Sequence, residues 1–430
     1  MPIRLDTAEP DFESRFVALL GSKREASQEV GDIVAGIIAD VQARGDAAVA
    51  ELTNKFDKAG VTAQTLRFTE AEIDAADRRV TPEVRRALQF AHDRIRAHHE
   101  KQKPVDQIYT DHLGVTLGTR WTALDAVGIY VPGGLASYPS SVLMNAVPAK
   151  VAGVERIAMA VPTQSGQLSA SILCAAKIAG VTEIYRIGGA QAIAAFAYGT
   201  ASIGKVDKVI GPGNAFVAAA KRQVFGTVGI DMIAGPSEVL VIADQSANPA
   251  WIAADLIAQA EHGGGAQSIL VTTDARIADA TARQMDYQLS ELPRENIARD
   301  GWEEFGAIIL VASMDEAVVL ANRIASEHVE LAVDDPQALL PRIRHAGAIF
   351  LGHHTPEAIG DYVGGSNHVL PTARSARFAS GLGVLDFVKR TSILGCDPTA
   401  LAALAEAAIV LSEVEQLDGH GRSISIRLNR

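Results

Sequence analysis

The chain has 430 residues, with 39 Lys and Arg against 51 Asp and Glu, which gives a formal net charge of −12. Hydrophobic residues make up 48% of it and charged residues 21%, a balance typical of globular proteins and not of disordered or fibrous ones. Nucleic acids and anionic membranes require clustered Lys and Arg, so the acidic balance argues against both as partners. It favours a small-molecule ligand, and the length suggests roughly two to four domains.

Cysteine content and the N-terminus indicate the compartment. Two cysteines, Cys174 and Cys396, cannot form a disulfide framework or a Cys-rich zinc site. Cys174 lies in an apolar run and is expected to be a buried core residue. The first residues are acidic where a secretory signal needs an apolar stretch, and no segment approaches the roughly 20 apolar residues of a membrane-spanning helix. We therefore expect a soluble, cytoplasmic protein.

The pattern of apolar residues changes along the chain. The first 110 residues are helix-patterned, with apolar residues at threes and fours over 32–56 and 70–101. From about Thr122, short β-rich runs alternate with Ala-rich helical stretches, which indicates parallel sheets covered on both faces. The expected strands are 126–131, 156–161, 183–187, 206–210, 238–243, 268–272, 307–311, 329–333 and 348–351. The expected helices are 169–179, 190–198, 215–224, 249–262, 315–326 and 398–411.

So many strands exceed one ordinary doubly wound sheet, which predicts two α/β domains. Gly235, Pro236 and Ser237 form a loop composition suited to the junction between them. The polar tail after the last helix cannot form a core alone, so it must pack on another domain or another subunit.

Glycine-rich loops follow three of the expected strands, at Gly133, Gly188 and Gly211. Ligands of open α/β sheets collect beyond the carboxyl ends of the strands, where glycine lets the backbone approach a phosphate. No strand-linked Gly-x-Gly-x-x-Gly occurs, because Phe216 stands where its third glycine would be, and no phosphate-binding P-loop occurs either. The loops alone therefore favour a nucleotide site and ordinary turns about equally.

Polar and ionisable residues in the second half are expected at corresponding strand ends. Gln259 and His262 are three apart at the end of a helix and so share one face. The others are Glu327, His328, Asp361 and His368. Nitrogen and oxygen ligands of this kind suit Zn²⁺ or Mn²⁺. Each residue alone also has an ordinary structural role open to it, as a helix cap or a partner of a helix end.

Taken together, several stretches make the chain resemble histidinol dehydrogenase from about Asp32 to the C-terminus. They are 127–134, 188–195, 206–216, 234–238, 259–262, 326–331, 360–362, 367–372 and 380–390. That family oxidises L-histidinol to L-histidine in two NAD⁺-dependent steps through an aldehyde, as the last step of histidine biosynthesis, and uses a zinc ion. One departure from its pattern is the run of glycines at 263–265, where the family more often has a polar residue after the histidine.

The resemblance implies a role for each matching residue. The zinc ligands would be Gln259, His262, Asp361 and His420, and the acid/base pair would be Glu327 and His328. The histidinol contacts would be Ser237, Gln259, His262, Glu327, His328, Asp361, His368, Glu415 and His420, with Lys389 a weaker candidate. The NAD contacts would be Tyr130, Gln191 and Asn214.

The chemistry of the substrate explains why these groups converge. Zinc held by neutral nitrogen and oxygen ligands can accept both nitrogens of histidinol and fix its CH₂OH carbon against the nicotinamide. His328 suits removal of the hydroxyl proton, since an unperturbed imidazole has a pKa of about 6.5. Glu327 is expected to orient or deprotonate the water that adds to the aldehyde.

We expect two doubly wound parallel-sheet (Rossmann-like) domains with a helical N-terminal region and a C-terminal extension. The expected parts are an N-terminal arm, 1–25; a metal-binding catalytic domain, 26–129 with 238–381; a dinucleotide-binding domain, 130–237; and a dimerisation extension, 382–430. The resemblance implies a homodimer in which the tail completes the partner's site. Two alternatives are a paralogue that oxidises another primary alcohol, such as a sulfonated diol, and a two-domain solute-binding protein. The intact tail from Glu415 to His420 disfavours the first, and the adjacent Glu327 and His328 disfavour the second.

Overall fold

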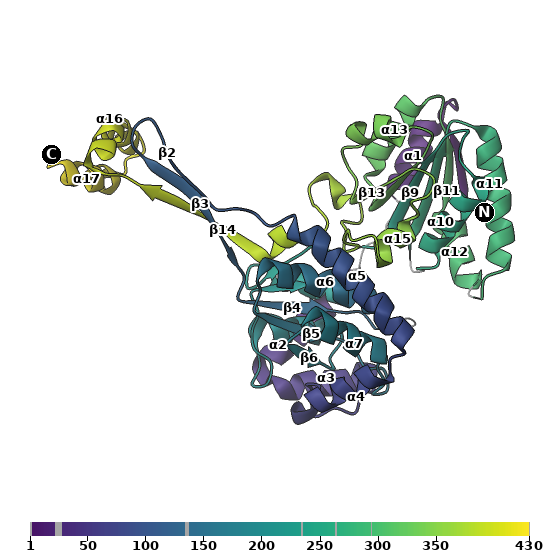
Figure 1. Ribbon diagram of the computed structural model, residues 1–430, viewed down its shortest axis with the longest axis horizontal. Helices are drawn as coiled ribbons and strands as arrows, with labels where there is room; N and C mark the ends of the chain where they lie inside the picture. The colour runs from purple at the N-terminus through teal and green to yellow at the C-terminus, as the bar shows by residue number, and fades with distance from the viewer. Residues whose placement is uncertain are drawn as a thin grey trace.

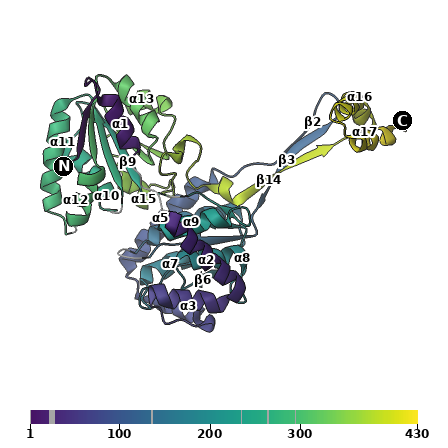
Figure 2. The same cartoon turned by 180° about the vertical axis from the view of Figure 1, so that it is seen from behind.

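The computed structural model describes residues 2–21, 28–133, 137–233, 235–262, 265–293 and 295–429. It has two α/β bodies side by side and a long arm that projects from one of them and ends in two helices (Figure 1). Seen from behind, the arm again points away from both bodies (Figure 2).

The first body is built on a five-stranded parallel sheet in the order β6-β5-β4-β7-β8. Its central strand β4 (Ala126–Tyr130) is buried along its whole length, which explains its apolar sequence. The other strands are β5 (Arg156–Ala160), β6 (Glu183–Tyr185), β7 (Lys208–Ile210) and β8 (Gly229–Ile230). Helices α2 (Gln28–Arg44), α3 (Asp46–Asp57), α8 (Gly189–Tyr198) and α9 (Ala215–Val224) share one hydrophobic cluster with this sheet. Helices α4 (Glu70–Arg79), α5 (Pro82–Glu100), α6 (Pro139–Ala152) and α7 (Ala170–Ala179) share the other.

The second body holds a six-stranded parallel sheet in the order β1-β11-β10-β9-β12-β13. Its strands are β1 (Ile3–Asp6), β9 (Glu238–Ala243), β10 (Gln267–Thr272), β11 (Ala307–Leu310), β12 (His328–Ala332) and β13 (Ala348–Leu351). One cluster joins the sheet to α1 (Phe12–Gly21), α13 (Met314–Ile324) and α14 (Pro336–Leu339). The other joins it to α10 (Pro249–Ala260), α11 (Ala275–Ser290) and α12 (Glu295–Phe305). The short helix α15 (Glu357–Tyr362) follows β13.

Within each body the strands lie in the order third, second, first, fourth, fifth, with β1 added at the outer edge of the second sheet. This order is that of doubly wound folds, in which the chain crosses over at the first strand and continues on the other side. The prediction of two doubly wound parallel sheets is therefore confirmed. Strand β8 of the first sheet ends at Ile230, and the next strand, β9, starts at Glu238 and belongs to the second sheet.

The arm is antiparallel and differs from both bodies. It consists of β2 (Gln107–Thr110), β3 (Thr116–Ala123) and β14 (Val388–Gly395), with α16 (Pro398–Val414) and α17 (Asp418–Ser425) at its tip. Large apolar side chains on it remain exposed, among them Leu394 at 69% and Val414 at 75%. A group of exposed large apolar side chains is unusual on a monomeric protein, so the arm presents a surface suited to contact with another chain.

The predicted grouping of segments differs from the structure in two places. Residues 1–25 are not a separate arm: β1 pairs with β11 and α1 packs under the second sheet, while residues 22–25 lie outside the described part. The expected domain of 26–129 with 238–381 also differs: residues 26–27 lie outside the described part, α2 to α5 cover the two faces of the first sheet, and β4 is its central strand. The extension expected at 382–430 also recruits β2 and β3 from residues 107–123.

Two smaller expectations can be compared with the structure. Cys174 is fully buried in the core of the first body, as predicted, and burial raises the pKa of its thiol to about 11. Among the residues that the structure describes, no helix combines the length and the apolar character needed to cross a bilayer.

Candidate active site

A cavity of about 290 Å³ lies between the two α/β bodies. The first body lines it with residues that include Pro132, Tyr138, Ser141, Pro212 and Asp231. The second body lines it with residues that include Ser237, His262, Glu327, His328, Asp361 and His368. Six of the residues predicted from sequence therefore face one space.

The two sheets present opposite edges to this cavity. Pro132 and Pro212 follow β4 and β7, at the carboxyl ends of the first sheet. Ser237 and Glu327 instead precede β9 and β12, so they lie at the amino ends of the second sheet. The expectation that both halves use carboxyl ends is thus wrong for the second. Closeness to a strand in sequence does not distinguish its amino end from its carboxyl end, because a residue just before a strand and one just after it lie at opposite edges of the sheet.

His328 is held as a neutral imidazole. Its Nδ1 lies 3.0 Å from the carbonyl oxygen of Glu238, which can only accept, so Nδ1 is the protonated nitrogen. Burial lowers the pKa of His328 to about 3, so the ring is uncharged at neutral pH. Its Nε2 is buried and has no hydrogen-bond partner among the described residues. An unprotonated nitrogen is therefore free at the cavity wall, although its pKa departs from the near-neutral value expected from sequence.

Glu327 lies beside His328 and is also buried. Its Oε2 accepts a hydrogen bond of 3.0 Å from the backbone N–H of Glu238 and lies 3.7 Å from Nδ1 of His328. Burial, together with the negative charges of Glu238 and Asp361, raises the pKa of the Glu327 carboxyl well above its usual range. A raised pKa makes the ionised form of this carboxyl a stronger proton acceptor than an exposed glutamate.

Sequence analysis missed a buried acidic neighbour of this pair, Glu357 at the start of α15. Its Oε1 lies 3.4 Å from Nδ1 of His328, and its backbone N–H donates to Oε1 of Glu330 at 2.7 Å. Burial raises the pKa of both carboxyls well above the usual range. One signal was available: Glu330 stands two residues after His328 in an apolar strand, so both side chains point to the same face.

Three of the four predicted metal ligands lie at the cavity or beside it. Gln259 Nε2 and His262 Nδ1 are 3.3 Å apart at the end of α10, so the two side chains share a face as predicted. Gln259 is completely buried, and its Oε1 has no hydrogen-bond partner among the described residues. Asp361 is half-buried, and burial raises its pKa to about 6, with His262 opposing the shift. An orphaned amide oxygen, an imidazole and a carboxylate are donors that fit zinc.

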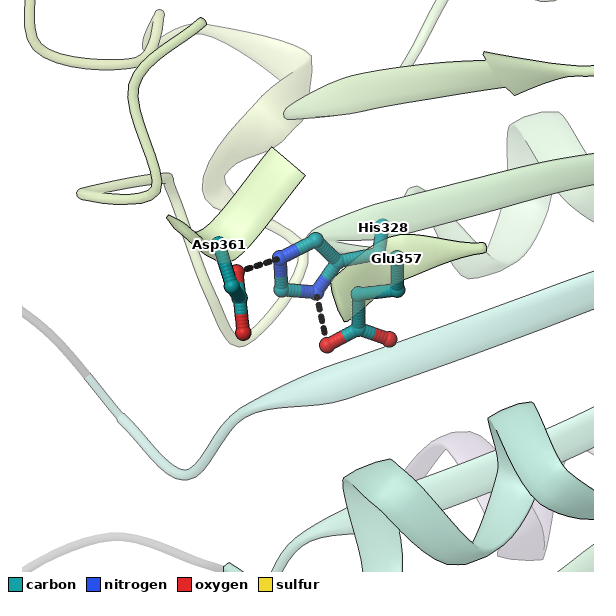
Figure 3. Close-up of side chains that lie close together, drawn as sticks. All are labelled: His328, Glu357 and Asp361. Atoms are coloured by element: carbon teal, nitrogen blue, oxygen red, sulfur yellow. Dashed lines mark ion pairs between the residues drawn. The ribbon is translucent and has the colours of Figure 1, made fainter. Parts of the chain in front are cut away.

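A different trio, His328, Glu357 and Asp361, also places ligand atoms within 4.8 Å of one another. Figure 3 shows why it is the poorer candidate: Asp361 approaches Nε2 of His328, 3.9 Å away, whereas Glu357 lies at Nδ1 on the other side of the ring. One ion cannot contact both nitrogens of a ring, and Nδ1 already donates to Glu238. The trio is better described as a base with two flanking carboxyls.

The fourth predicted ligand, His420, is not near the other three in this chain. It lies on α17, and Glu415 caps the end of α16, both at the tip of the arm. In both views α17 is at the opposite end of the molecule from α15, which holds Asp361 (Figures 1 and 2). Both side chains are exposed. Within one chain the predicted set is therefore incomplete, because no element brings the tip of the arm back to its own cavity.

The other predicted substrate contacts have different environments. His368 is hydrogen-bonded at both ring nitrogens: Nδ1 donates to the carbonyl oxygen of Asp361 at 3.0 Å, and Nε2 accepts from Oγ of Ser141 in the first body at 3.3 Å. Burial lowers its pKa to about 4. The weaker candidate Lys389 is exposed on β14 opposite Thr122 and is not among the residues lining the cavity.

The predicted dinucleotide contacts lie at the carboxyl edge of the first sheet. Tyr130 accepts a hydrogen bond of 3.1 Å from the backbone N–H of Gly189, and burial raises its pKa to about 12, so the phenol stays protonated. Gln191 is buried, with both amide atoms unpartnered among the described residues. Asn214 caps α9 through Oδ1, which leaves its Nδ2 as a donor. Parts of two predicted loops, residue 134 and residues 263–264, lie outside the described residues.

Comparison with known proteins identifies the family. The family model described as histidinol dehydrogenase matches residues 21–428. The chain is 62% identical over 429 residues to the histidinol dehydrogenase of Rhizobium meliloti (strain 1021), covering 100% of this chain and 99% of that one. It is 61% identical over 430 residues to that of Rhodopseudomonas palustris (strain ATCC BAA-98 / CGA009), covering both completely. A crystal structure of histidinol dehydrogenase from Elizabethkingia anophelis superposes with a TM-score of 0.95 at 36% identity, covering 100% of this chain and 98% of that one. With the cavity and its converging side chains, these matches establish that the chain belongs to the histidinol dehydrogenase family.

Proposed function

We propose that this protein oxidises L-histidinol to L-histidine in two NAD⁺-dependent steps, through the aldehyde, with a bound zinc ion. The observation that carries the proposal is the wall of the cavity formed by the second body. There a neutral imidazole with a free Nε2 lies beside a buried carboxyl of raised pKa and close to Gln259, His262 and Asp361. Family membership supplies the substrate class.

The ligands of the zinc ion would be Oε1 of Gln259, His262 and Asp361, with His420 contributed by a second copy of the chain. When bound, the ion supplies a fixed positive charge that coordinates the nitrogens of an amino alcohol. The unpartnered amide oxygen of Gln259 supports this assignment, since a buried oxygen without a donor is costly unless a ligand satisfies it.

His328 is the proposed general base. Because Nδ1 donates to the carbonyl of Glu238, the ring is fixed with Nε2 unprotonated, and this nitrogen can take the proton of the substrate hydroxyl. The flanking Glu357 carboxyl lies 3.4 Å from Nδ1, on the side of the ring opposite Nε2. Removal of this proton lets hydride leave the carbon for the nicotinamide.

Glu327 is the proposed base for the second oxidation. The aldehyde must first add water to form a hydrate, and a carboxylate in the same wall can orient that water and accept its proton. Its hydrogen bond from the backbone N–H of Glu238 and a side-chain hydrogen bond from Ser237 hold the carboxyl at the wall of the cavity.

The proposed cofactor site is the carboxyl edge of the first sheet. Gln191 supports this, because its two unpartnered amide atoms can bind the polar groups of a dinucleotide. The free Nδ2 of Asn214 adds a donor at the start of α9.

We further propose a homodimer whose arms exchange, so that Glu415 and His420 of one chain complete the site of the other. The exposed apolar residues of the arm and the incomplete ligand set in one chain support it. We also propose a cytoplasmic setting, where both cysteines, unpaired here, stay reduced.

The test is NADH formation from NAD⁺ and purified protein, followed by absorbance. L-histidinol should yield two NADH per molecule, and prolonged treatment with a chelator should abolish activity until zinc is restored. A sulfonated diol serves as the control substrate and should give no NADH. Metal-replete protein that leaves histidinol unchanged would refute the proposal.

A further inference from the structure

A buried ion pair lies directly beneath the glycine loop of the first body. Lys221 is on α9, and Asp231 follows β8; their side chains are 2% and 1% exposed. The two side chains contact each other, and each also binds the backbone of the same residue, Gly211. Lys221 Nζ donates to the carbonyl oxygen of Gly211 at 3.0 Å, and Oδ2 of Asp231 accepts from the backbone N–H of Gly211 at 2.8 Å.

The cost of this arrangement is evidence that it has a purpose beyond stability. Removing two charges from water costs more than a buried pair usually regains, and an apolar replacement is often as stable. Such pairs can instead provide a unique geometry. Here the N–H and the carbonyl oxygen of Gly211 are bound by opposite charges, so neither peptide that flanks its Cα can turn without breaking a charge-assisted hydrogen bond.

The backbone of Gly211 lies so close to that of Tyr130 that no larger residue fits there. Its φ is +105°, and a Cβ at this residue would lie 2.1 Å from the carbonyl oxygen of Tyr130. Tyr130 in turn accepts from Gly189 of the neighbouring glycine loop. The ion pair thus holds Gly211 against Tyr130, and Tyr130 is also the residue to which Gly189 of the other glycine loop donates.

The loop is also fixed at its far end, where Asn214 caps α9. Between these two fixed points, Pro212 lines the cavity, as does Asp231 itself. The position of the Asn214 amide, and the width of the cavity at Pro212, therefore depend on how firmly Gly211 is held.

We propose that Lys221 and Asp231 are positioning residues for the dinucleotide: they hold the 211–214 loop in the conformation that binds it. This inference rests on the proposed function for the identity of the cofactor. Neither residue is a catalytic residue, since they act through the backbone of Gly211.

The test compares three purified proteins by direct NADH binding, measured by fluorescence titration, and by steady-state kinetics with histidinol. Lys221→Met/Asp231→Asn leaves no unpaired buried charge and removes the donor to Gly211 while keeping an acceptor. Arg156→Gln is the matched control, because the Arg156–Glu183 pair, 27% and 18% exposed, lies at the amino edge of the same sheet. Loss of one such hydrogen bond should weaken NADH binding about three- to tenfold.

We expect the double variant to show that loss in the NADH dissociation constant and in KM for NAD⁺, with kcat much less affected. The control should lower the melting temperature and leave NADH binding unchanged. NADH binding by the double variant as tight as by the wild type would overturn the inference, whatever happens to stability. If the double variant fails to fold, Lys221→Arg keeps the charges but displaces the donor, and it should weaken binding by a smaller factor; unchanged binding there would equally overturn it. Wild-type protein that binds no NADH would instead refute the proposed cofactor, and the inference with it.

Discussion

Replacing Glu327 with Gln should separate the two oxidations. The side chain is buried, and its Oε2 accepts from the backbone N–H of Glu238 at 3.0 Å. A glutamine has the same shape and its amide oxygen can keep that hydrogen bond, so the fold should be retained. What it loses is the ability to accept a proton. A positioned general base contributes typically 10²- to 10⁴-fold to a rate, so oxidation of the aldehyde should slow by a factor in that range.

The reverse reduction of the aldehyde to histidinol needs no added water, so it should slow by less than about threefold, a change corresponding to roughly half a kcal/mol. His328→Ala gives the contrast, because loss of the base at Nε2 should suppress hydride transfer in both steps. The assay supplies histidinal with NAD⁺ in one cuvette and with NADH in another, and follows absorbance. Aldehyde oxidation that is unimpaired in Glu327→Gln, or a reduction that falls equally, would refute the assigned role.

Three further outcomes are expected. Asn214→Asp keeps the cap of α9 but replaces the free amide donor with a negative charge, so NADH binding should weaken about tenfold with an unchanged melting temperature; equal binding would exclude a contact there. Asp361→Ala and His420→Ala should each be nearly inactive. When the two variants are mixed and allowed to exchange subunits, activity should return, because one site of each mixed dimer then has both ligands intact. No recovery would count against shared sites. The hydrogen bond with Arg276 lowers the pKa of Asp274 to about 2, so its stabilising effect is present above pH 4 and is lost between about pH 4 and 2. The Asp274→Asn variant should therefore lose less melting temperature than the wild type between about pH 4 and 2. Equal losses in the two proteins would contradict a stabilising role for the Asp274 carboxylate.

The parallel sheets were predictable because each central strand is an apolar run that its neighbours bury on both faces. The arm was not, because its strands carry no such pattern: all four residues of β2 are exposed, and β14 is mostly so. Strand β1 was not predicted, because only Leu5 in it is buried and its sequence has no apolar run. The packing of α2 to α5 on the first sheet depends on contacts far apart in sequence, which helix periodicity cannot assign.

For the site, the sequence located residues but not their environments. The neutral amide of Gln259 is not a typical metal ligand, and only its unpartnered buried oxygen singles it out physically. The tautomer of His328 follows from the backbone carbonyl of Glu238, which no side-chain pattern reveals. Glu357 is 27 residues from Glu330 in the sequence, so its position beside His328 can be seen only once the chain is folded.

The opposite sheet edges give the cleft a built-in electrical polarity. In the first body, α6 begins at the cleft and α9 begins shortly after Pro212, which lines it, so the partial positive charge of about half a unit at each helix start is directed toward the cleft. In the second body, α10 ends at the cleft with Gln259 and His262, so its partial negative charge is directed there. The backbone alone therefore makes one wall attractive to the pyrophosphate of a dinucleotide and the other to a cation. The two ligands would be sorted to their own walls before any side chain makes contact.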